Sequence, residues 1–409
     1  MQSARTVAVV ATLDTKGPEA LYVRDFVRSR GFAAIVVDVS THGEPPFLPD
    51  IASAEVRQAA ADMTSTPTEP AGRDALMKLM GTGAGRLLSR LCADGCLHGA
   101  IALGGNQGTC IAGIAMNMLP VGFPKLIVST VASGNIRPYV GSKDIAMMFS
   151  VADILGGINP VTQVILANAA GAICGMAHAW TPITAPTSGI VVGITAFGNV
   201  EPTVKRCVDL LQRQGNIPMT FHASGAGGSA MEDLIEQGII GAVIDIVTHE
   251  LIGDLYAEDA YSPAKPGRLV AAGRAGIPQV VSLGGLDYFV FGPLSLVPQK
   301  YHHRKIHYHN PFNTNIRTTP DEALAISRLL AERLNAAKGP VAVIAPLQGW
   351  TEFGREGGPL YDPESDALFV RTLKDLLRPG IRVIELDANI NDPVFSRVAV
   401  SILSELLDP

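Results

Sequence analysis

A glycine-rich segment near residue 104 has the residue types and spacing of a phosphate-binding loop. After the apolar run GAIAL come six small or polar residues, which are Gly104, Gly105, Asn106, Gln107, Gly108 and Thr109. Glycines let the backbone approach a phosphate, a helix that begins here adds partial positive charge, and a threonine hydroxyl can donate a hydrogen bond. The segment therefore predicts an anion site between a strand and a helix. A tight turn packed with small residues is the alternative, since neither GxxxxGK[ST] nor GxGxxG spacing occurs here.

A second loop with anion-binding character, TLDTKG, follows the apolar run 7–11. Lys16 can meet a phosphate as a point charge, and Asp14 can hold a metal ion or a ribose hydroxyl. The alternative is that Asp14 or Thr15 caps a helix that begins near Pro18, and the two roles can coexist.

Two weaker signals lie in the same half of the chain. Asp38 ends the second apolar run, at the sequence distance from the first loop where ribose-binding acids often lie. Ser133 and Gly134 follow the run KLIVS and can extend a phosphate site, although a simple polar loop explains them as well. The glycines of MGTGAGRLLSR follow no strand, so we predict that this segment is helical.

His222 and the glycine-rich turn after it form a second candidate anion site. His222 can act as a general acid or base beside backbone amides that bind a carboxylate or phosphate. A flexible glycine turn with a histidine at a strand end is the alternative. Glu250 follows the next predicted strand and is a candidate catalytic carboxylate. The candidate substrate-binding residues are Ser224, Gly225, Gly227, Gly228 and Arg317.

Four histidines lie in the segment His302–His309, and His307 and His309 point to one face if it is extended. Metal binding is one interpretation, although neighbouring basic residues disfavour a cation. A cationic rim for an anionic substrate, completed by Arg317, and a solvated or subunit-contacting loop are the others. The polar segment 346–366 is either a lid over a ligand or a surface loop.

Alternating apolar runs and helical patterns predict an α/β fold of two Rossmann-like domains, each with a mainly parallel sheet and helices on both faces. The stretch WTPITAPTS lacks apolar periodicity and marks a linker. We therefore predict an N-terminal nucleotide-binding domain at 1–180, a linker at 181–188 and a C-terminal domain at 189–409. Residues 286–317 form an insertion in the second domain, and residues 41–70 form a surface excursion.

The composition excludes several classes of function. Hydrophobic residues make up 47% of the chain and charged residues 17%, which is typical of aliphatic parallel sheets and not of disorder. Acids and bases are interspersed around a net charge of -6, so no direct contact with nucleic acid is expected. Neither a signal core nor a run of about 18 apolar residues occurs, so we expect a cytoplasmic protein that does not enter a membrane. The five cysteines form no CxxC pair and are expected to be free thiols.

Along essentially its whole length the chain resembles the Tm-1-like ATP-binding family, formerly the UPF0261 group. The resemblance rests on six ordered motifs, which are ATLDTKG, LGGNQGT, STVASGNIRPYVGSKD, HASGAGGSAME, GGLDYFVFG and YHNPFNTNIRTT. It implies two Rossmann-like subdomains, ATP bound in the N-terminal one together with Mg²⁺, and often a homodimer. The roles in the family range from a plant resistance protein that blocks viral RNA replication to bacterial members of metabolic character.

The loops and the resemblance together predict an ATP-binding protein. Its expected nucleotide contacts are Asp14, Thr15, Lys16, Asp38, Gly104, Gly105, Asn106, Gly108, Thr109, Ser133 and Gly134, with Asp14 also a ligand of Mg²⁺. We expect phosphoryl transfer to a small carboxylate substrate, or its activation, at the cleft between the domains, with Lys16, His222 and Glu250 as catalytic residues. The alternatives are a nucleotide-regulated binding protein without turnover and a hydrolase or lyase centred on the C-terminal domain.

Overall fold

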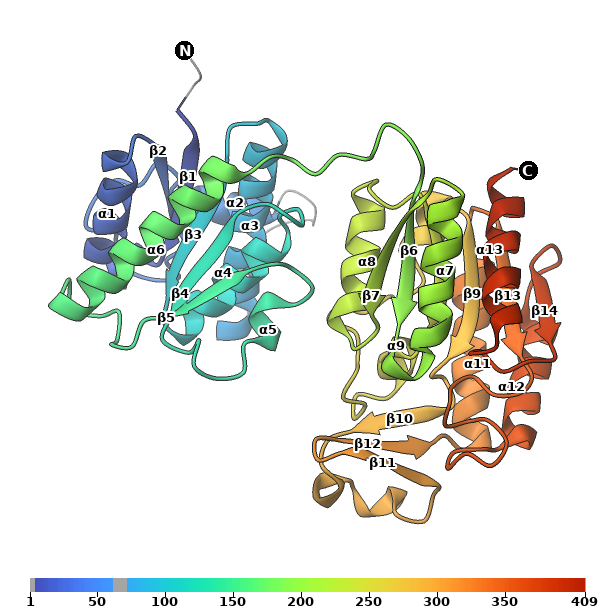
Figure 1. Cartoon of the computed structure of the whole chain (residues 1–409). Coiled ribbons are helices and arrows are strands. Elements are labelled where there is room, and N and C mark those ends of the chain that lie inside the picture. The colour runs from blue at the N-terminus through green and yellow to red at the C-terminus, as the bar shows by residue number, and fades with distance from the viewer. Residues whose placement is uncertain (1–3, 62–71, 409) are drawn as a thin grey trace. The chain divides into compact units, whose positions relative to one another are not determined.

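The computed structural model describes residues 4–61 and 72–408, and the chain divides into two compact units. The first unit ends at Ile183 and the second begins at Thr184. Each unit is built on one parallel sheet with helices packed against it (Figure 1). The predicted fold class, two Rossmann-like α/β domains, is therefore confirmed.

The sheet of the first unit has the strand order β2-β1-β3-β4-β5, and every neighbouring pair is parallel. Its strands are β1 (Thr6–Ala11), β2 (Ala33–Asp38), β3 (Gly99–Gly104), β4 (Lys125–Ser129) and β5 (Ala146–Phe149). The first four are apolar runs of the kind that suits a sheet buried on both faces, and the sequence predicts them. Strand β5, with the letters AMMF, contains no β-branched residue and carries no such signal.

Helices cover both faces of this sheet. They are α1 (Leu13–Ser29), α2 (Ser53–Ala61), α3 (Arg73–Ala93), α4 (Asn106–Asn117), α5 (Arg137–Val140) and α6 (Pro160–Ala179). Alternate strand residues point to opposite sides, so Val7 and Val9 share a core with α1 and α6. Ala8 and Val10 share the other core with α3 and α4. The segment MGTGAGRLLSR lies inside α3, as predicted.

Helix α6 is long and apolar enough to cross a membrane by length and composition alone. Its Leu166, Ala169, Ile173 and Ala177 recur at helical spacing and are buried in the core of the first unit. Asn159 caps its first turn, where the side-chain oxygen accepts hydrogen bonds from two backbone amides. Helix α6 is therefore packed as a core helix of this unit.

The sheet of the second unit has the order β14-β13-β9-β8-β6-β7 and is also parallel. Its strands are β6 (Val191–Ala196), β7 (Ile217–His222), β8 (Ala242–Val247), β9 (Gln279–Gly284), β13 (Val341–Pro346) and β14 (Arg382–Leu386). All six correspond to apolar runs that the sequence predicts as strands.

Helices also cover both faces of the second sheet. They are α7 (Glu201–Arg213), α8 (Ala226–Glu236), α9 (Glu250–Leu255), α10 (Ala271–Ala275), α11 (Pro320–Asn335), α12 (Pro363–Leu376) and α13 (Pro393–Leu407). Val280 and Ile344 belong to the core that contains α7 and α13. Their chain neighbours Val281 and Val343 belong to the core that contains α11 and α12. Neighbouring apolar residues in these strands therefore point to opposite faces of the sheet and pack into two different cores.

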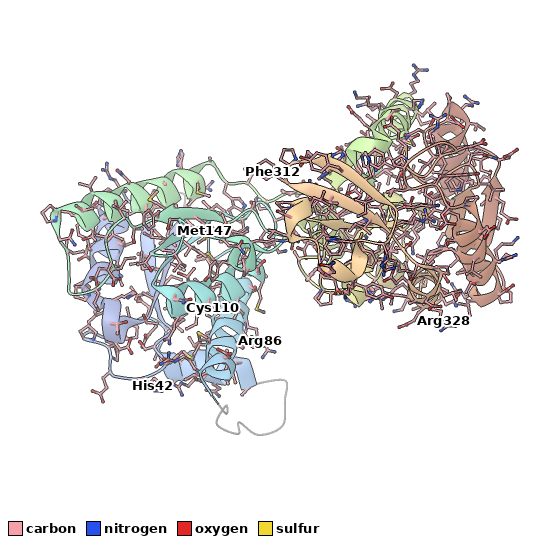
Figure 2. The ribbon with its side chains drawn as sticks, turned by 90° about the horizontal axis from the view of Figure 1, so that it is seen from below. His42, Arg86, Cys110, Met147, Phe312 and Arg328 are labelled. Atoms are coloured by element: carbon pink, nitrogen blue, oxygen red, sulfur yellow. The ribbon has the colours of Figure 1, made fainter. Side chains whose placement is uncertain are left out.

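Residues 286–317 contain a small antiparallel sheet with the order β10-β12-β11. Its strands are β10 (Tyr288–Phe291), β11 (Ile306–Asn310) and β12 (Asn313–Arg317), and Figure 1 shows them in orange at the foot of the second unit. Phe289 and Ile316 point into the core that contains α11 and α12. The turn between β11 and β12 exposes Phe312 (Figure 2), whose side chain is 75% accessible.

Candidate functional site

The first candidate site lies where the strand order of the first sheet reverses. The chain passes from β1 to β2 on one side and then to β3 on the other, so the loops after β1 and β3 diverge at the carboxyl ends of the strands. A cavity of about 260 Å³ lies there. It is lined by Thr12, Asp14, Thr15, Lys16, Thr41, Gly105, Asn106, Gln107 and Gly108. The structure thus brings the TLDTKG and GGNQGT loops to one cavity.

The amino end of α4 supplies hydrogen-bond donors to this cavity. Gly105 precedes the helix, and no side chain in the described part of the chain caps it. Within residues 4–61 and 72–408, no acceptor pairs with the backbone amides of Asn106, Gln107 and Gly108. These are the donors that a helix leaves unpaired in its first turn, and they carry partial positive charge. Gly104 makes the turn possible, because a methyl group there would overlap the backbone of the first helical turn.

The amino end of α1 is capped by the chain itself. The Leu13 amide donates to Oδ1 of Asp38 at 3.2 Å, and the Asp14 amide donates to Oγ of Ser40 at 3.1 Å. Asp38 is buried and does not line the cavity. The sequence suggests a ribose contact for Asp38. In the structure its carboxylate instead accepts a hydrogen bond from the loop after β1 and fixes that loop.

Lys16 lies in the wall of the cavity at a kink in α1. Its backbone is not helical, and Pro18 follows in the first regular turn, as the sequence predicts. Its Nζ donates a hydrogen bond of 2.8 Å to the carbonyl oxygen of Ile154, and only 8% of the residue is accessible. The ammonium group is therefore tied to a neighbouring loop and does not extend into solvent. The hydroxyl groups of Thr12 and Thr15 lie 3.0 Å apart, and both residues are more accessible than Lys16.

Besides Asp38 and Gly104, three predicted contacts do not line this cavity. Thr109 is fully buried, and its hydroxyl lies 2.7 Å from the Gly105 carbonyl oxygen and 2.7 Å from Oγ of Ser129. It therefore shapes the loop instead of meeting a ligand. Ser133 and Gly134 are exposed and do not line the cavity.

A second cavity, of about 310 Å³, adjoins the first. Thr41 and Gln107 line both cavities, and His42, labelled in Figure 2, lines the second. The other residues of its wall are Gly72, Arg73, Leu76 and Met77. Sequence reasoning missed Thr41 and His42, because they lie in a Pro-rich stretch that reads as a surface excursion. The signal available was their position directly after a buried strand, at the same sheet edge as the other two loops.

In the second unit, the glycine turn after β7 binds an internal carboxylate. The amides of Gly225 and Gly228 donate to Oε1 of Glu250 at 2.6 and 3.1 Å. The other oxygen of Glu250 accepts a hydrogen bond of 2.6 Å from Nε of Arg268. The expected anion site therefore exists, but Glu250 occupies its amides. The amides of Gly225 and Gly228, which the sequence suggests for a substrate, are thus already paired with Glu250. The catalytic role of Glu250 and the substrate contacts of Ser224 and Gly227 stay predictions.

Arg268 joins three buried carboxylates and was not among the predicted residues. Besides Glu250, its guanidinium pairs with Glu232 at 2.9 Å and with Asp245 at 2.9 Å. Its side chain is 1% accessible. The sequence VIDIVTHELIGD contains two acids of this cluster, Asp245 and Glu250, whereas Glu232 lies in α8 and Arg268 in a separate loop that no local pattern connects to them.

The other predicted cation of this unit is also paired. Arg317 donates to Asp287 at 3.3 Å and forms an ion pair with Asp366. It is therefore unavailable as a rim for an anionic substrate. His307 and His309 do share one face of β11, with ring centroids 6.0 Å apart, and both pack against Phe353. The described part of the chain holds no group of three or more His, Cys, Asp or Glu side chains arranged for a metal ion.

A third cavity, of about 190 Å³, lies in the second unit near the carboxyl ends of β6 and β7. His222 lines it, so this predicted residue does reach a cavity, but without its expected glycine-turn partners. The wall consists of Phe197, Gly198, Asn199, His222, Tyr261, Tyr288, Val290, His309, Asn313, Asn315 and Phe353. The small antiparallel sheet supplies five of these residues.

His249 is a fully buried residue packed against the aromatic wall of this cavity. Its Nδ1 lies 2.6 Å from the carbonyl oxygen of Gly285, and its Nε2 lies 3.2 Å from Oδ1 of Asp259. Both neighbours are acceptors, so both ring nitrogens must carry hydrogen to satisfy them. Burial disfavours the charged ring, but the Asp259 carboxylate and the Gly285 carbonyl outweigh burial and raise the pKa of His249.

The stability of the second unit is expected to depend on the charge of His249. A raised pKa in the folded state stabilises the protein fully below the ordinary histidine pKa of about 6.5, and this contribution is lost as the pH rises through the folded-state pKa. His249→Gln should therefore destabilise the chain more at about pH 6 than at about pH 9, as measured by urea unfolding. His303→Gln, at an exposed histidine, is the control, and a pH-independent loss in His249→Gln would contradict a charged ring.

The fold and these cavities define a class: a two-unit α/β protein with Rossmann-like sheets and candidate ligand sites at the carboxyl ends of the strands. Family models described as the N-terminal and C-terminal domains of the uncharacterised protein family UPF0261 match residues 5–182 and 190–407. The chain belongs to the UPF0261 family, which confirms the resemblance drawn from its six motifs.

Its relatives extend over nearly the whole chain. A UPF0261 protein of Clostridium tetani is 38% identical over 96% of both chains, and one of Rhizobium meliloti is 36% identical over 99% of this chain and 100% of the other. The ToMV resistance protein Tm-1(GCR237) of Solanum lycopersicum is 34% identical over 98% of this chain and 55% of its own length. Among solved structures, MurG of Acinetobacter baumannii covers 98% of this chain and 99% of its own, with 10% identity and a TM-score of 0.22, which is too distant to support an argument.

Proposed function

We propose that the protein binds a nucleoside triphosphate, ATP by preference, in the cavity at the carboxyl ends of β1 and β3. The observation that carries this proposal is the set of unpaired amides at the first turn of α4, because such donors stabilise phosphate oxygens. Thr12 and Thr15 line the same cavity and add hydroxyl donors. Gly105 and Gly108 place no side chain between the backbone and a phosphate.

The adjoining cavity gives room for the nucleoside. Leu76 and Met77 form an apolar wall against which a base can pack, and the polar side chain of Arg73 lies beside them. Thr41 and Gln107 line both cavities, so one extended ligand such as ATP can occupy the two together.

Mg²⁺ would enter this site with the nucleotide. Asp14 is a carboxylate in the wall of the phosphate cavity. Mg²⁺ is usually held by one or two carboxylates together with substrate phosphates and water, and a single lining carboxylate fits that pattern. The metal would neutralise charge on the phosphates, and Asp14 would fix its position.

Phosphoryl transfer, or ATP-dependent activation of a small molecule, is the reaction class that we propose for this nucleotide site, because positioning and charge stabilisation supply most of the catalysis in such reactions. An anionic substrate is not part of the proposal, since the amides and the arginine expected to bind it are already paired. The alternative is a binding protein that ATP switches between two states. Steady-state ATP hydrolysis with a panel of small acceptors separates the two, and saturable binding without any turnover favours the alternative.

Asn106→Asp is expected to weaken ATP binding at least about tenfold without unfolding the chain. The new carboxylate has the shape of the amide that it replaces, but it stands at the first turn of α4, where it repels phosphates and competes for the backbone amides. A carboxylate at this position stabilises a helix by about 0.3–1 kcal/mol, so the thermal unfolding midpoint should hold or rise. Isothermal titration calorimetry with Mg-ATP measures the affinity.

Asn159→Asp is the matched control. Asn159 caps α6 in the same unit and lies outside the cavity, so this change adds the same charge at the start of another helix. Its affinity for ATP should equal that of the unaltered chain. Equal weakening by both variants would reveal a general charge effect, and the absence of heat with ATP and GTP would overturn the nucleotide proposal.

A further inference from the structure

The cavity beside the small antiparallel sheet is bounded by a buried polar face. Along β12, Asn313, Asn315 and Arg317 alternate with two residues on the opposite side, of which Ile316 lies in the core. Asn313 and Asn315 line the cavity together with His222, which comes from the end of β7. A sheet that already buries an apolar face has no need of a second buried face for stability. The polar face therefore calls for another explanation.

One amide on this face, and another in the turn after β6, have atoms without the hydrogen-bond partners that buried amides need. Asn315 is 5% accessible and lines the cavity, and its side chain makes no hydrogen bond with any residue that the structure describes. The Nδ2 of Asn199 donates to the hydroxyl of Tyr288 at 2.9 Å, whereas its Oδ1 is buried without a partner in residues 4–61 and 72–408. An unpaired buried amide destabilises a protein, so the amide of Asn315 in the wall of the cavity indicates a ligand or ordered water.

Aromatic rings form much of the remaining wall. Phe197, Tyr261, Tyr288 and Phe353 all line the cavity. His249 supports three of them from behind, with its ring centroid 5.3 Å from Phe197, 6.0 Å from Tyr261 and 5.4 Å from Tyr288. Rings held in this way offer fixed flat surfaces against which a planar ligand can stack.

The charge of the wall narrows the class of ligand. No carboxylate, ammonium or guanidinium group belongs to the residues that line this cavity. Arg317 shares the polar face of β12, but Asp287 and Asp366 neutralise it. When His222 and His309 of the wall are uncharged, a charged ligand would lose its hydration here without meeting an opposite charge. Asparagine amides, by contrast, offer both donors and acceptors to an uncharged polar group.

We infer that this cavity is a binding site for a small, uncharged, planar ring compound that carries both a donor and an acceptor, such as an aromatic carboxamide. The amides of Asn313 and Asn315 would pair with its polar edge, and the aromatic wall would pack on its ring. The volume of about 190 Å³ is sufficient, since an apolar cavity of roughly 150 Å³ holds benzene. The inference goes beyond the nucleotide proposal and does not depend on it, because the two sites lie in different units.

Nicotinamide and nicotinate provide a direct test. They have the same planar ring, but nicotinamide has an uncharged carboxamide where nicotinate has a carboxylate. We expect saturable binding of nicotinamide to the full chain at about pH 8, above the ordinary histidine pKa, and binding of nicotinate at least about tenfold weaker. Cyclohexanecarboxamide keeps the amide without the planar ring and should also bind more weakly than nicotinamide. Saturation-transfer NMR and calorimetry measure the three affinities.

Asn315→Leu keeps the branched shape of the side chain and removes its amide, so it should weaken nicotinamide binding at least about tenfold. Thr314→Val is the matched control, because Thr314 is buried on the opposite face of β12 and its hydroxyl has no partner in the described part of the chain. It should leave binding unchanged. Asn106→Asp should also leave nicotinamide binding unchanged, which separates this site from the nucleotide site.

Three results would overturn the inference. One is binding of nicotinate as tight as that of nicotinamide, which would make the cavity an anion site. Another is the lack of saturable binding of all three compounds at millimolar concentration. The last is an Asn315→Leu variant that retains the native fluorescence of buried Trp350 and binds nicotinamide as tightly as the unaltered chain.

Discussion

Replacing Arg268 by methionine is expected to destabilise the second unit by at least about 4 kcal/mol and to leave little of it folded. The substitution keeps an apolar stem but removes the guanidinium that pairs with Glu232, Asp245 and Glu250. Removing one partner of a buried ion pair costs about 3–5 kcal/mol, and here three carboxylates lose the same partner. Total stabilities are typically about 5–15 kcal/mol, so the loss is a large part of the whole. Urea unfolding followed by the fluorescence of buried Trp350 measures it.

Arg382→Met is the control for this prediction. Arg382 pairs with Glu405 at 2.9 Å in the same unit, but both side chains are 53% accessible. Exposed pairs contribute about 0–1 kcal/mol, so this variant should unfold almost like the unaltered chain. A loss of less than about 1 kcal/mol in Arg268→Met would mean that the buried carboxylates find other partners or take up protons. The assignment of Arg268 as the centre of this cluster would then be wrong.

The second large effect is expected from Gly83→Ala in α3. A methyl group at Gly83 would overlap the carbonyl oxygen of Val56 in α2, so the two helices would have to move apart. Overpacking of this kind costs about 1–3 kcal/mol or more, whereas alanine gains about 1 kcal/mol over glycine in helix propensity. We expect a net loss of about 2 kcal/mol in the first unit. The fluorescence of Trp180, in a Trp350→Phe background, reports on this unit alone.

Gly175→Ala, in the same unit, is expected to change the stability in the opposite direction. Gly175 lies in α6 and is exposed, and a methyl group there would meet no atom of residues 4–61 and 72–408 within 4 Å. Only the propensity gain of about 0.5–1 kcal/mol remains, so this variant should be more stable than the unaltered chain. If both glycine variants shifted stability in the same direction, the close approach of α2 and α3 would not be the reason for Gly83.

Much of the fold follows from local sequence patterns. Runs such as VAVVA and GAIALG have the length and β-branched content of buried strands, and Pro18 and Gly31 delimit the helix between the first two. Strand β5 and the sheet β10-β12-β11 cannot be predicted from such local patterns. AMMF has no strand signal, and the pairing of Asn315 with Val290 and His307 joins segments that only the turns of the chain bring together.

The candidate site was predicted in part. Asp14, Thr15, Lys16, Gly105, Asn106 and Gly108 do line one cavity, because glycine and polar residues after parallel strands collect at one edge of the sheet. Thr41 and the amides of the second-unit cavity were missed. The signal for Asn313 and Asn315 was their spacing in NTNIR, which places the two asparagines and Arg317 on one side of a strand.

The sequence alone determined the strand, loop and helix units, the family, and which loops contain glycine and hydroxyl residues. Each of these depends on neighbours along the chain. Only the tertiary structure decided which polar groups are available to a ligand. The amides of Gly225 and Gly228 are satisfied by Glu250, whereas those at the start of α4 are not, because partners for such groups come from distant segments. A hydrogen bond already made within the fold removes a donor from function, and no local pattern records it.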